Sequence, residues 1–232
     1  MSVNVSENYK RIRDIVLDTT VKAGRKEEEV ELIAVTKYVD LDRIEQAINA
    51  GAKSVGENKV QEYLKKAAFF REHNINADII GQLQTNKVKY ITGEVRYIQS
   101  VDRLPLANEI NKHACAKNLV QNVLVEVNIG NEKNKGGIAQ EDLYELLCEI
   151  SQLKGISVKG LMCIPPAVSE KEARAYFAKM KKIFDDIASK KIDNIQMKQL
   201  SMGMSSDFVA AIKEGATMVR VGSAIFGARN YN

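Results

Sequence analysis

Cysteine and histidine are scarce in this chain of 232 residues, which has three cysteines and two histidines. The cysteines, Cys115, Cys148 and Cys163, are far apart, odd in number and outside any CxxC spacing. The sequence therefore predicts neither a disulfide framework nor a zinc site. His73 and His113 are too few for a histidine-rich metal site or a histidine-based catalytic triad. Unpaired cysteines are typical of a reducing compartment, so the predicted location is cytoplasmic.

Long apolar runs and basic-aromatic modules are also missing. No stretch approaches the length of a membrane span, and the N-terminal segment MSVNVSENYKRIRD lacks the apolar core of a signal peptide. Aromatic residues make up 6% of the chain, and 34 basic against 30 acidic residues leave a net charge of +4. Because a nucleic-acid surface needs denser positive charge or stacking residues, the sequence predicts neither a nucleic-acid partner nor a membrane partner.

Short apolar segments alternate regularly with longer amphipathic ones along the chain. The composition is that of an ordinary globular protein, with 45% hydrophobic and 28% charged residues, and no linker interrupts it. Residues 1–232 are therefore predicted to form one domain. The predicted strands are 32–36, 54–57, 78–83, 97–101, 122–128, 158–163, 198–202 and 217–222. The predicted helices between them are 40–51, 58–73, 103–117, 141–153, 169–189 and 205–216.

Eight strands that alternate with helices in a chain of this length indicate a (β/α)8 TIM barrel. An extra helix at 6–23 is expected before the first strand, and Ser205 or Ser206 is expected to cap the helix at 205–216. A doubly wound open sheet is the alternative architecture, but no GxGxxG motif follows the first strand.

The first predicted strand ends on Lys37, at the position where barrel enzymes place their chemistry. A lysine that is partly withdrawn from water has a lowered pKa. More of it is then the neutral amine, which attacks a carbonyl group to form a Schiff base. The alternative is a salt-bridged or snorkelling lysine that closes the barrel mouth.

Two strand-to-helix turns near the C-terminus have the composition of phosphate-binding turns. RVGSAIFG (220–227) places Gly222 and Ser223 where backbone N–H groups bind an anion, and LSMGMSSD (200–207) supplies a second turn with hydroxyl groups. A reactive lysine and two phosphate turns around one barrel mouth favour a phosphorylated aldehyde. Pyridoxal 5′-phosphate is the commonest such ligand held through a lysine.

Arg220 precedes the last of these turns. A guanidinium group that faces a pyridine nitrogen can only donate, which keeps this nitrogen unprotonated and makes the ring a poor electron sink. Alternatively, Arg220 pairs with a carboxylate such as Glu57 or Asp207, or takes part in phosphate binding.

Several motifs in order along the chain resemble those of the pyridoxal phosphate homeostasis proteins. They are LIAVTK (32–37), GENKVQE (56–62), IIGQLQTNK (79–87), SVDR (100–103), VEVN (125–128), GLM (160–162), LSMGMSSDF (200–208) and VRVGSAIFG (219–227). This family is a single-domain barrel of fold type III, similar to the N-terminal domain of alanine racemase. The resemblance spans nearly the whole chain.

The resemblance implies a set of cofactor-binding residues. Lys37 is the Schiff-base lysine by this likeness, and Arg220 lies near the ring nitrogen. The phosphate-binding positions are Ser201, Met202, Gly222 and Ser223. Asn58 and Met162 lie near the ring.

The same resemblance implies a protein that binds pyridoxal phosphate and regulates its supply without catalytic turnover. Racemases of this fold need a second base from an additional β-domain, and only SAIFGARNYN follows the last strand here. Tyr231, in this tail, is expected to be mobile rather than catalytic. The alternatives are a pyridoxal phosphate-dependent racemase or related enzyme, and an aldolase that uses Lys37 without a cofactor. Apo-enzymes that accept the cofactor are the expected partners, and a monomer is favoured.

Overall fold

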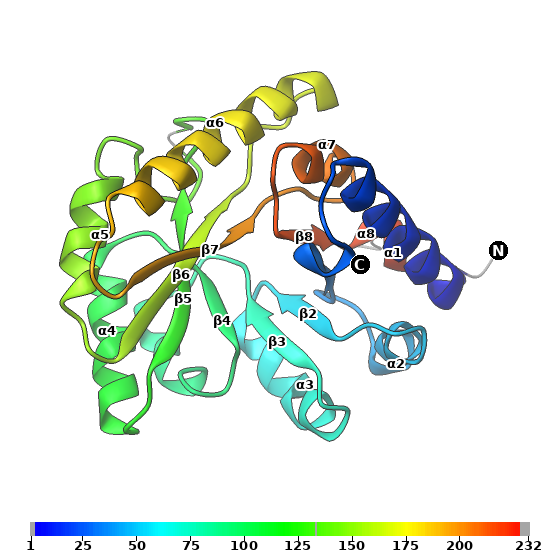
Figure 1. Cartoon of the computed structure of the whole chain (residues 1–232). Helices are drawn as coiled ribbons and strands as arrows, with labels where there is room; N and C mark the ends of the chain where they lie inside the picture. The colour runs from blue at the N-terminus through cyan, green and yellow to red at the C-terminus, as the bar shows by residue number, and fades with distance from the viewer. Residues whose placement is uncertain (1–2, 133, 228–232) are drawn as a thin grey trace.

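The computed structural model describes residues 3–132 and 134–227 of the chain. Within these residues eight strands form one closed parallel barrel in sequence order, which confirms the predicted (β/α)8 fold (Figure 1). The strands are β1 (Glu31–Val35), β2 (Ser54–Glu57), β3 (Asn76–Ile79), β4 (Tyr97–Val101), β5 (Gln121–Val127), β6 (Ile156–Cys163), β7 (Ile195–Ser201) and β8 (Met218–Val221). The helices are α1 (Val5–Lys22), η1 (Glu27–Glu29), α2 (Leu41–Asn49), α3 (Val60–Glu72), η2 (Thr85–Tyr90), α4 (Leu104–Ala116), α5 (Leu143–Ser151), α6 (Glu170–Ser189), α7 (Phe208–Lys213) and α8 (Ser223–Phe226).

The extra N-terminal helix is confirmed as α1. The side chain of Asn4 caps it by accepting a hydrogen bond of 3.1 Å from the N–H of Glu7. Its buried face, with Tyr9, Ile12 and Val16, packs beside α2, α7 and α8 (Figure 1). Among the described residues, no helix combines the length and the apolar character that a membrane crossing requires.

The third strand differs from the prediction. Residues 78–83 were expected to be extended, whereas β3 begins at Asn76 and ends at Ile79. A Cβ atom at Gly81 would lie 2.4 Å from the carbonyl oxygen of Asn58, so the two backbones are already in contact and the chain turns there. The short 3-10 helix η2 then takes the place of an α-helix before β4.

Gly160 lets β6 and β7 approach each other closely. Its φ is 152°, and a Cβ atom there would lie 1.8 Å from the carbonyl oxygen of Gln199. The pairing register of the two strands shifts between Val158 and Gly160, at the same place. A side chain at this position would therefore separate the two strands.

The inside of the barrel is partly apolar and partly polar. Ile33, Leu124, Met162 and Met218 come from four different strands and form a small apolar cluster across the barrel axis. Four fully or almost fully buried polar side chains accompany it: Asp78, Gln99, Ser201 and Arg220. TIM barrels are ordinarily filled with layers of branched aliphatic residues, so these polar groups distinguish this barrel interior.

Candidate functional site

A cavity of about 280 Å³ opens at the C-terminal mouth of the barrel. Its lining includes Lys37 after β1, Asn58 after β2, Ser205 after β7, and Arg220, Gly222 and Ser223 on and after β8. The carboxyl ends of parallel strands meet at this face of a barrel. The structure therefore brings Lys37, Asn58, Arg220, Gly222 and Ser223 of the predicted residues together in one cavity.

Lys37 is half-buried in a turn whose two flanking residues are both anchored to α3. On one side, the hydroxyl group of Thr36 donates to Glu57 Oε1 at 2.7 Å, and its carbonyl oxygen accepts from Lys66 Nζ at 2.7 Å. On the other side, the N–H of Tyr38 donates to Glu62 at 2.8 Å. Tyr38 has a φ of 60°, a left-handed conformation that a tyrosine adopts only when its surroundings impose it. These contacts fix the backbone that carries Lys37.

The anchor includes a buried ion pair, in which Lys66 Nζ lies 2.8 Å from Glu57 Oε1. Burial raises the pKa of Glu57, and the neighbouring ammonium group of Lys66 opposes this effect. Glu57 is therefore committed to α3, so the alternative that it pairs with Arg220 is wrong.

Arg220 is almost fully buried beneath the cavity, with 3% of its surface exposed. Its Nη1 donates to the hydroxyl oxygen of Ser201 at 2.6 Å, and its Nη2 donates to the carbonyl oxygen of Cys163 at 2.9 Å. Burial lowers the pKa of this guanidinium group, although arginine remains protonated in proteins. Within the described part of the chain, no carboxylate lies within ion-pair distance of Arg220. The alternative pairing with Asp207 is therefore wrong as well.

Ser205 holds the backbone donors at the start of α8. Its hydroxyl oxygen accepts from the N–H of Gly222 at 3.2 Å and from the N–H of Ala224 at 3.3 Å. The prediction that Ser205 or Ser206 caps the following helix is wrong, because α7 begins only at Phe208 and its N-cap residue is Asp207. The two turns recognised in the sequence thus meet through one serine.

Three predicted residues lie below the cavity rather than on its wall. Ser201 is fully buried, and its hydroxyl group accepts from Arg220 and donates to Gln99 at 2.7 Å. Met202 is fully buried, and its N–H donates to the carbonyl oxygen of Met218. Met162 belongs to the apolar cluster inside the barrel. Their roles toward a cofactor remain predictions, and Tyr231 lies outside the described residues.

Asn58 carries an unsatisfied polar atom at the cavity. Its side-chain oxygen Oδ1 is buried and accepts no hydrogen bond from any described residue. An isolated buried acceptor is unusual, and it can meet a ligand in the cavity only if the Asn58 side chain turns.

Glu126, on β5, was not recognised from the sequence. It is 7% exposed, and burial together with the nearby charge of Asp102 raises its pKa to about 7, while the positive charge of Arg220 opposes the rise. A Cβ atom at Gly136 would lie 3.5 Å from Glu126 Oε2 and 3.1 Å from Gln82 Nε2, so the 134–138 loop covers this carboxyl group. The sequence signal was an acidic residue within an otherwise apolar strand, VLVEV.

Comparison with known proteins places the chain in a family. The family model for the alanine racemase N-terminal domain matches residues 5–230. The pyridoxal phosphate homeostasis protein of Aquifex aeolicus is 43% identical over 99% of this chain and 100% of its own length. The protein of the same name from Escherichia coli strain K12 is 35% identical over 99% of this chain and 98% of its own length.

Solved structures give the same result. PipY of Synechococcus elongatus with pyridoxal phosphate bound has a TM-score of 0.80 at 30% identity, over 91% of this chain and 100% of that one. A protein of unknown function from Bifidobacterium adolescentis has a TM-score of 0.90 at 34% identity, over 96% of this chain and 94% of that one. Alanine racemase of Clostridium difficile, at 17% identity and a TM-score of 0.68, shares the barrel fold over 60% of its length. The chain therefore belongs to the alanine racemase N-terminal domain family and, within it, to the pyridoxal phosphate homeostasis proteins.

Proposed function

We propose that this protein binds pyridoxal 5′-phosphate as a Schiff base on Lys37 and takes part in intracellular homeostasis of this cofactor, buffering or delivering it without catalytic turnover. The observation that carries the proposal is the position of Lys37 at the cavity of a barrel that is similar to a PipY structure holding the same cofactor. On this proposal, residues 1–232 act as one cofactor-binding domain.

The residues of the cavity fit this cofactor. Pyridoxal phosphate supplies an aldehyde for a lysine amine, a phosphate group for backbone N–H donors, and a ring with a hydroxyl group and a nitrogen. The N–H groups of Gly222 and Ala224 donate to the hydroxyl oxygen of Ser205, and a phosphate oxygen that takes these donors would displace this hydroxyl group. Asn58 also lines the cavity, and a turn of its side chain would offer the amide group to the ligand.

Arg220 is expected to limit the chemistry that the bound cofactor supports. It lines the cavity as a permanent donor, so a ring nitrogen that faces it stays unprotonated. An unprotonated ring withdraws electrons weakly and gives little help to carbanion chemistry. The curated relatives are likewise named for homeostasis of the cofactor rather than for a reaction.

The test is an absorption spectrum of the protein after incubation with pyridoxal phosphate, followed by borohydride reduction and peptide mapping. We expect a visible band and a reduced pyridoxyl group on Lys37, and both should be lost in Lys37→Ala. Lys59→Ala is the matched control, because Lys59 is exposed at the rim, 5.4 Å from the centre of the Tyr38 ring. A protein that stays colourless and unlabelled contradicts the proposal.

Exchange of an amino acid's α-hydrogen with solvent separates this proposal from a racemase. We expect no exchange above the rate of free pyridoxal phosphate. Fast exchange that is abolished by Lys37→Ala would instead show an enzyme.

We further propose that apo-enzymes dependent on pyridoxal phosphate accept the cofactor from this protein, which acts as a monomer in the cytoplasm. Its three cysteines are all free thiols, as a reducing compartment requires. Transfer should appear as gain of activity in an apo-enzyme mixed with the loaded protein, at a rate above that of spontaneous release.

A further inference from the structure

A line of buried hydrogen bonds crosses the barrel from Arg220 to the opposite wall. Arg220 Nη1 donates to Ser201 Oγ at 2.6 Å, and Ser201 Oγ donates to Gln99 Oε1 at 2.7 Å. Gln99 Nε2 then donates to Asp78 Oδ2 at 2.8 Å. Ser201 is on β7 and Gln99 is on β4, so their bond spans the barrel interior. We call these four residues the polar relay.

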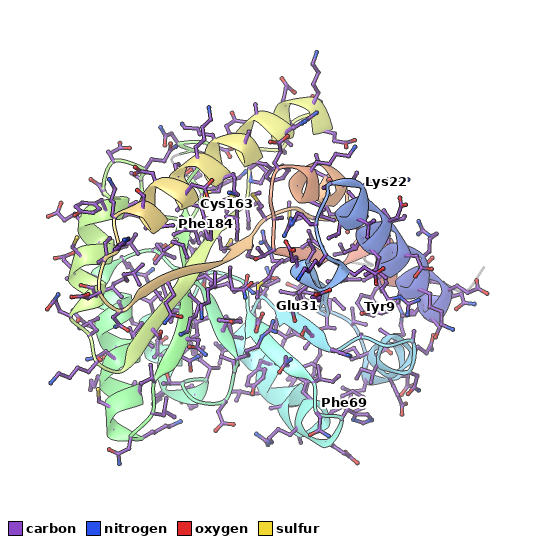
Figure 2. The ribbon with its side chains drawn as sticks, in the orientation of Figure 1. Tyr9, Lys22, Glu31, Phe69, Cys163 and Phe184 are labelled. Atoms are coloured by element: carbon purple, nitrogen blue, oxygen red, sulfur yellow. The ribbon has the colours of Figure 1, made fainter. Side chains whose placement is uncertain are left out.

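The far end of the polar relay is a carboxylate held by an arginine. Arg96 donates to both oxygens of Asp78, from Nε to Oδ1 at 3.0 Å and from Nη2 to Oδ2 at 2.8 Å. Its Nη1 donates to Glu31 at 2.6 Å. Figure 2 labels Glu31, at the amino end of β1, and Cys163, at the carboxyl end of β6, whose carbonyl oxygen accepts from Arg220.

The direction of every hydrogen bond in the polar relay follows from its two ends. Arginine only donates, so Asp78 accepts from Arg96 with both oxygens. Gln99 must therefore turn its amide N–H to Asp78 and its carbonyl oxygen to Ser201. The Ser201 hydroxyl group must then donate its proton to Gln99, so its oxygen keeps a lone pair that accepts from Arg220. The relay thus links a buried cation to a buried anion through aligned neutral dipoles.

This arrangement compensates Arg220 for its burial. A buried cation without an ion pair is costly unless dipoles and hydrogen bonds replace its lost water. Ser201 and the carbonyl oxygen of Cys163 hold two of its donors, which fixes the plane of the guanidinium group. Since Arg220 lines the cavity, the relay determines the direction in which its remaining donors point.

We propose that Gln99 and Asp78 are positioning residues for the cofactor, which act through Ser201 by orienting and polarising Arg220. The proposal rests on the proposed function, because it takes pyridoxal phosphate as the ligand of the cavity. Neither residue lines the cavity, so the effect on the cofactor is indirect.

The relay is tested with Gln99→Met, which keeps the size of the side chain and removes both hydrogen bonds, and with Ser201→Ala. Ser201→Thr retains the hydroxyl group and serves as the rescue variant. Thr20→Val is the matched control, because Thr20 is a fully buried residue on α1, outside the barrel, whose hydroxyl group donates to the carbonyl oxygen of Val16 at 2.7 Å. Each purified protein is loaded with pyridoxal phosphate. The measurements are the visible absorption maximum, the pH midpoint of this band and the rate of cofactor release into excess aldehyde trap.

We expect Gln99→Met and Ser201→Ala to shift the pH midpoint and to release the cofactor about fivefold faster, less than the full effect of losing a hydrogen bond to a charged group because both variants act on the cofactor through Arg220. Ser201→Thr should restore wild-type values, and Thr20→Val should not change them. If Gln99→Met does not fold, Asp78→Asn decides, because it keeps the size of the side chain, removes the charge at the far end of the relay and lies away from the cavity. A coloured wild type with unchanged spectra and release rates in the folded relay variants overturns the relay and leaves the proposed function intact. A colourless wild type overturns the proposed function itself.

Discussion

Replacement of Glu126 by glutamine is expected to stabilise the cofactor-free protein, and increasingly so as the pH rises from 5 to 8. The carboxyl group is buried, none of the described residues places a cation within ion-pair distance of it, and it lies near the negative charge of Asp102. Ionisation of Glu126 in the folded protein is therefore unfavourable. A neutral glutamine of nearly the same size avoids this cost.

The magnitude follows from the pKa of Glu126, which is raised from 4.5 to about 7. Between these values the folded protein binds a proton that the unfolded protein releases, so the free energy of unfolding falls as the pH rises. The stability associated with protonated Glu126 is fully present below pH 4.5 and is lost as the pH rises through 7. When fully developed, the loss is about 3 kcal/mol, an upper value because the surroundings relax.

The assay is urea denaturation of wild type and Glu126→Gln at pH 5, 6, 7 and 8. The difference in the free energy of unfolding should be small at pH 5 and should approach about 3 kcal/mol at pH 8. Glu145→Gln is the control, since it makes the same change at a carboxyl group that is exposed on α5. A difference between wild type and Glu126→Gln that does not change with pH refutes the reasoning, because it means that Glu126 does not titrate in this range.

Two further substitutions test the anchor of Lys37 and the contact between β6 and β7. Lys66→Met leaves Glu57 buried without its cation, which should lower the free energy of unfolding by about 3–5 kcal/mol in urea denaturation. Adding Glu57→Gln should recover most of this loss. If the losses of the two single variants instead add up in the double variant, the ion-pair argument is contradicted. Gly160→Ala places a methyl group 1.8 Å from the carbonyl oxygen of Gln199 and should cost at least about 3 kcal/mol in the same assay. Gly24→Ala is the control: Gly24 also has a positive φ, but an added Cβ atom would meet no described atom within 4 Å, so the free energy of unfolding should fall by only about 1 kcal/mol. Equal losses of stability in the two variants would show that backbone movement relieves the crowding at residue 160.

The barrel was predictable from sequence because most strands are buried on both faces and read as short apolar runs between amphipathic helices. One exception is β7, which begins at Ile195 rather than at 198 and whose first residues are half-buried or exposed. Another is β3, where the run IIGQL continues past Ile79 although the chain turns away at Gly81. Apolar residues beyond a strand end are buried as well, so hydrophobicity alone does not mark the last strand residue.

The candidate site was less completely predictable, because a strand end specifies the mouth of the barrel but not the depth of each side chain. Lys37 and Gly222 lie in the connecting segments and reach the cavity, whereas Ser201 is the last residue of β7 and points below it. Ser205 reaches the start of α8 only through tertiary contact. To predict that Glu126 is buried, one must know which face of β5 lies inside the barrel, and only the closed sheet shows this.

The polar relay also has a consequence for how the chain folds. Its residues come from β3, β4, β7 and β8, and its central bond, from Ser201 to Gln99, joins the two halves of the barrel, so the relay is completed only when the halves meet. A half-barrel intermediate would have to keep Arg220, or Asp78 and Arg96, solvated at an open edge. Closure of the barrel, rather than formation of any single βα unit, should therefore be the step that commits the chain to its native topology.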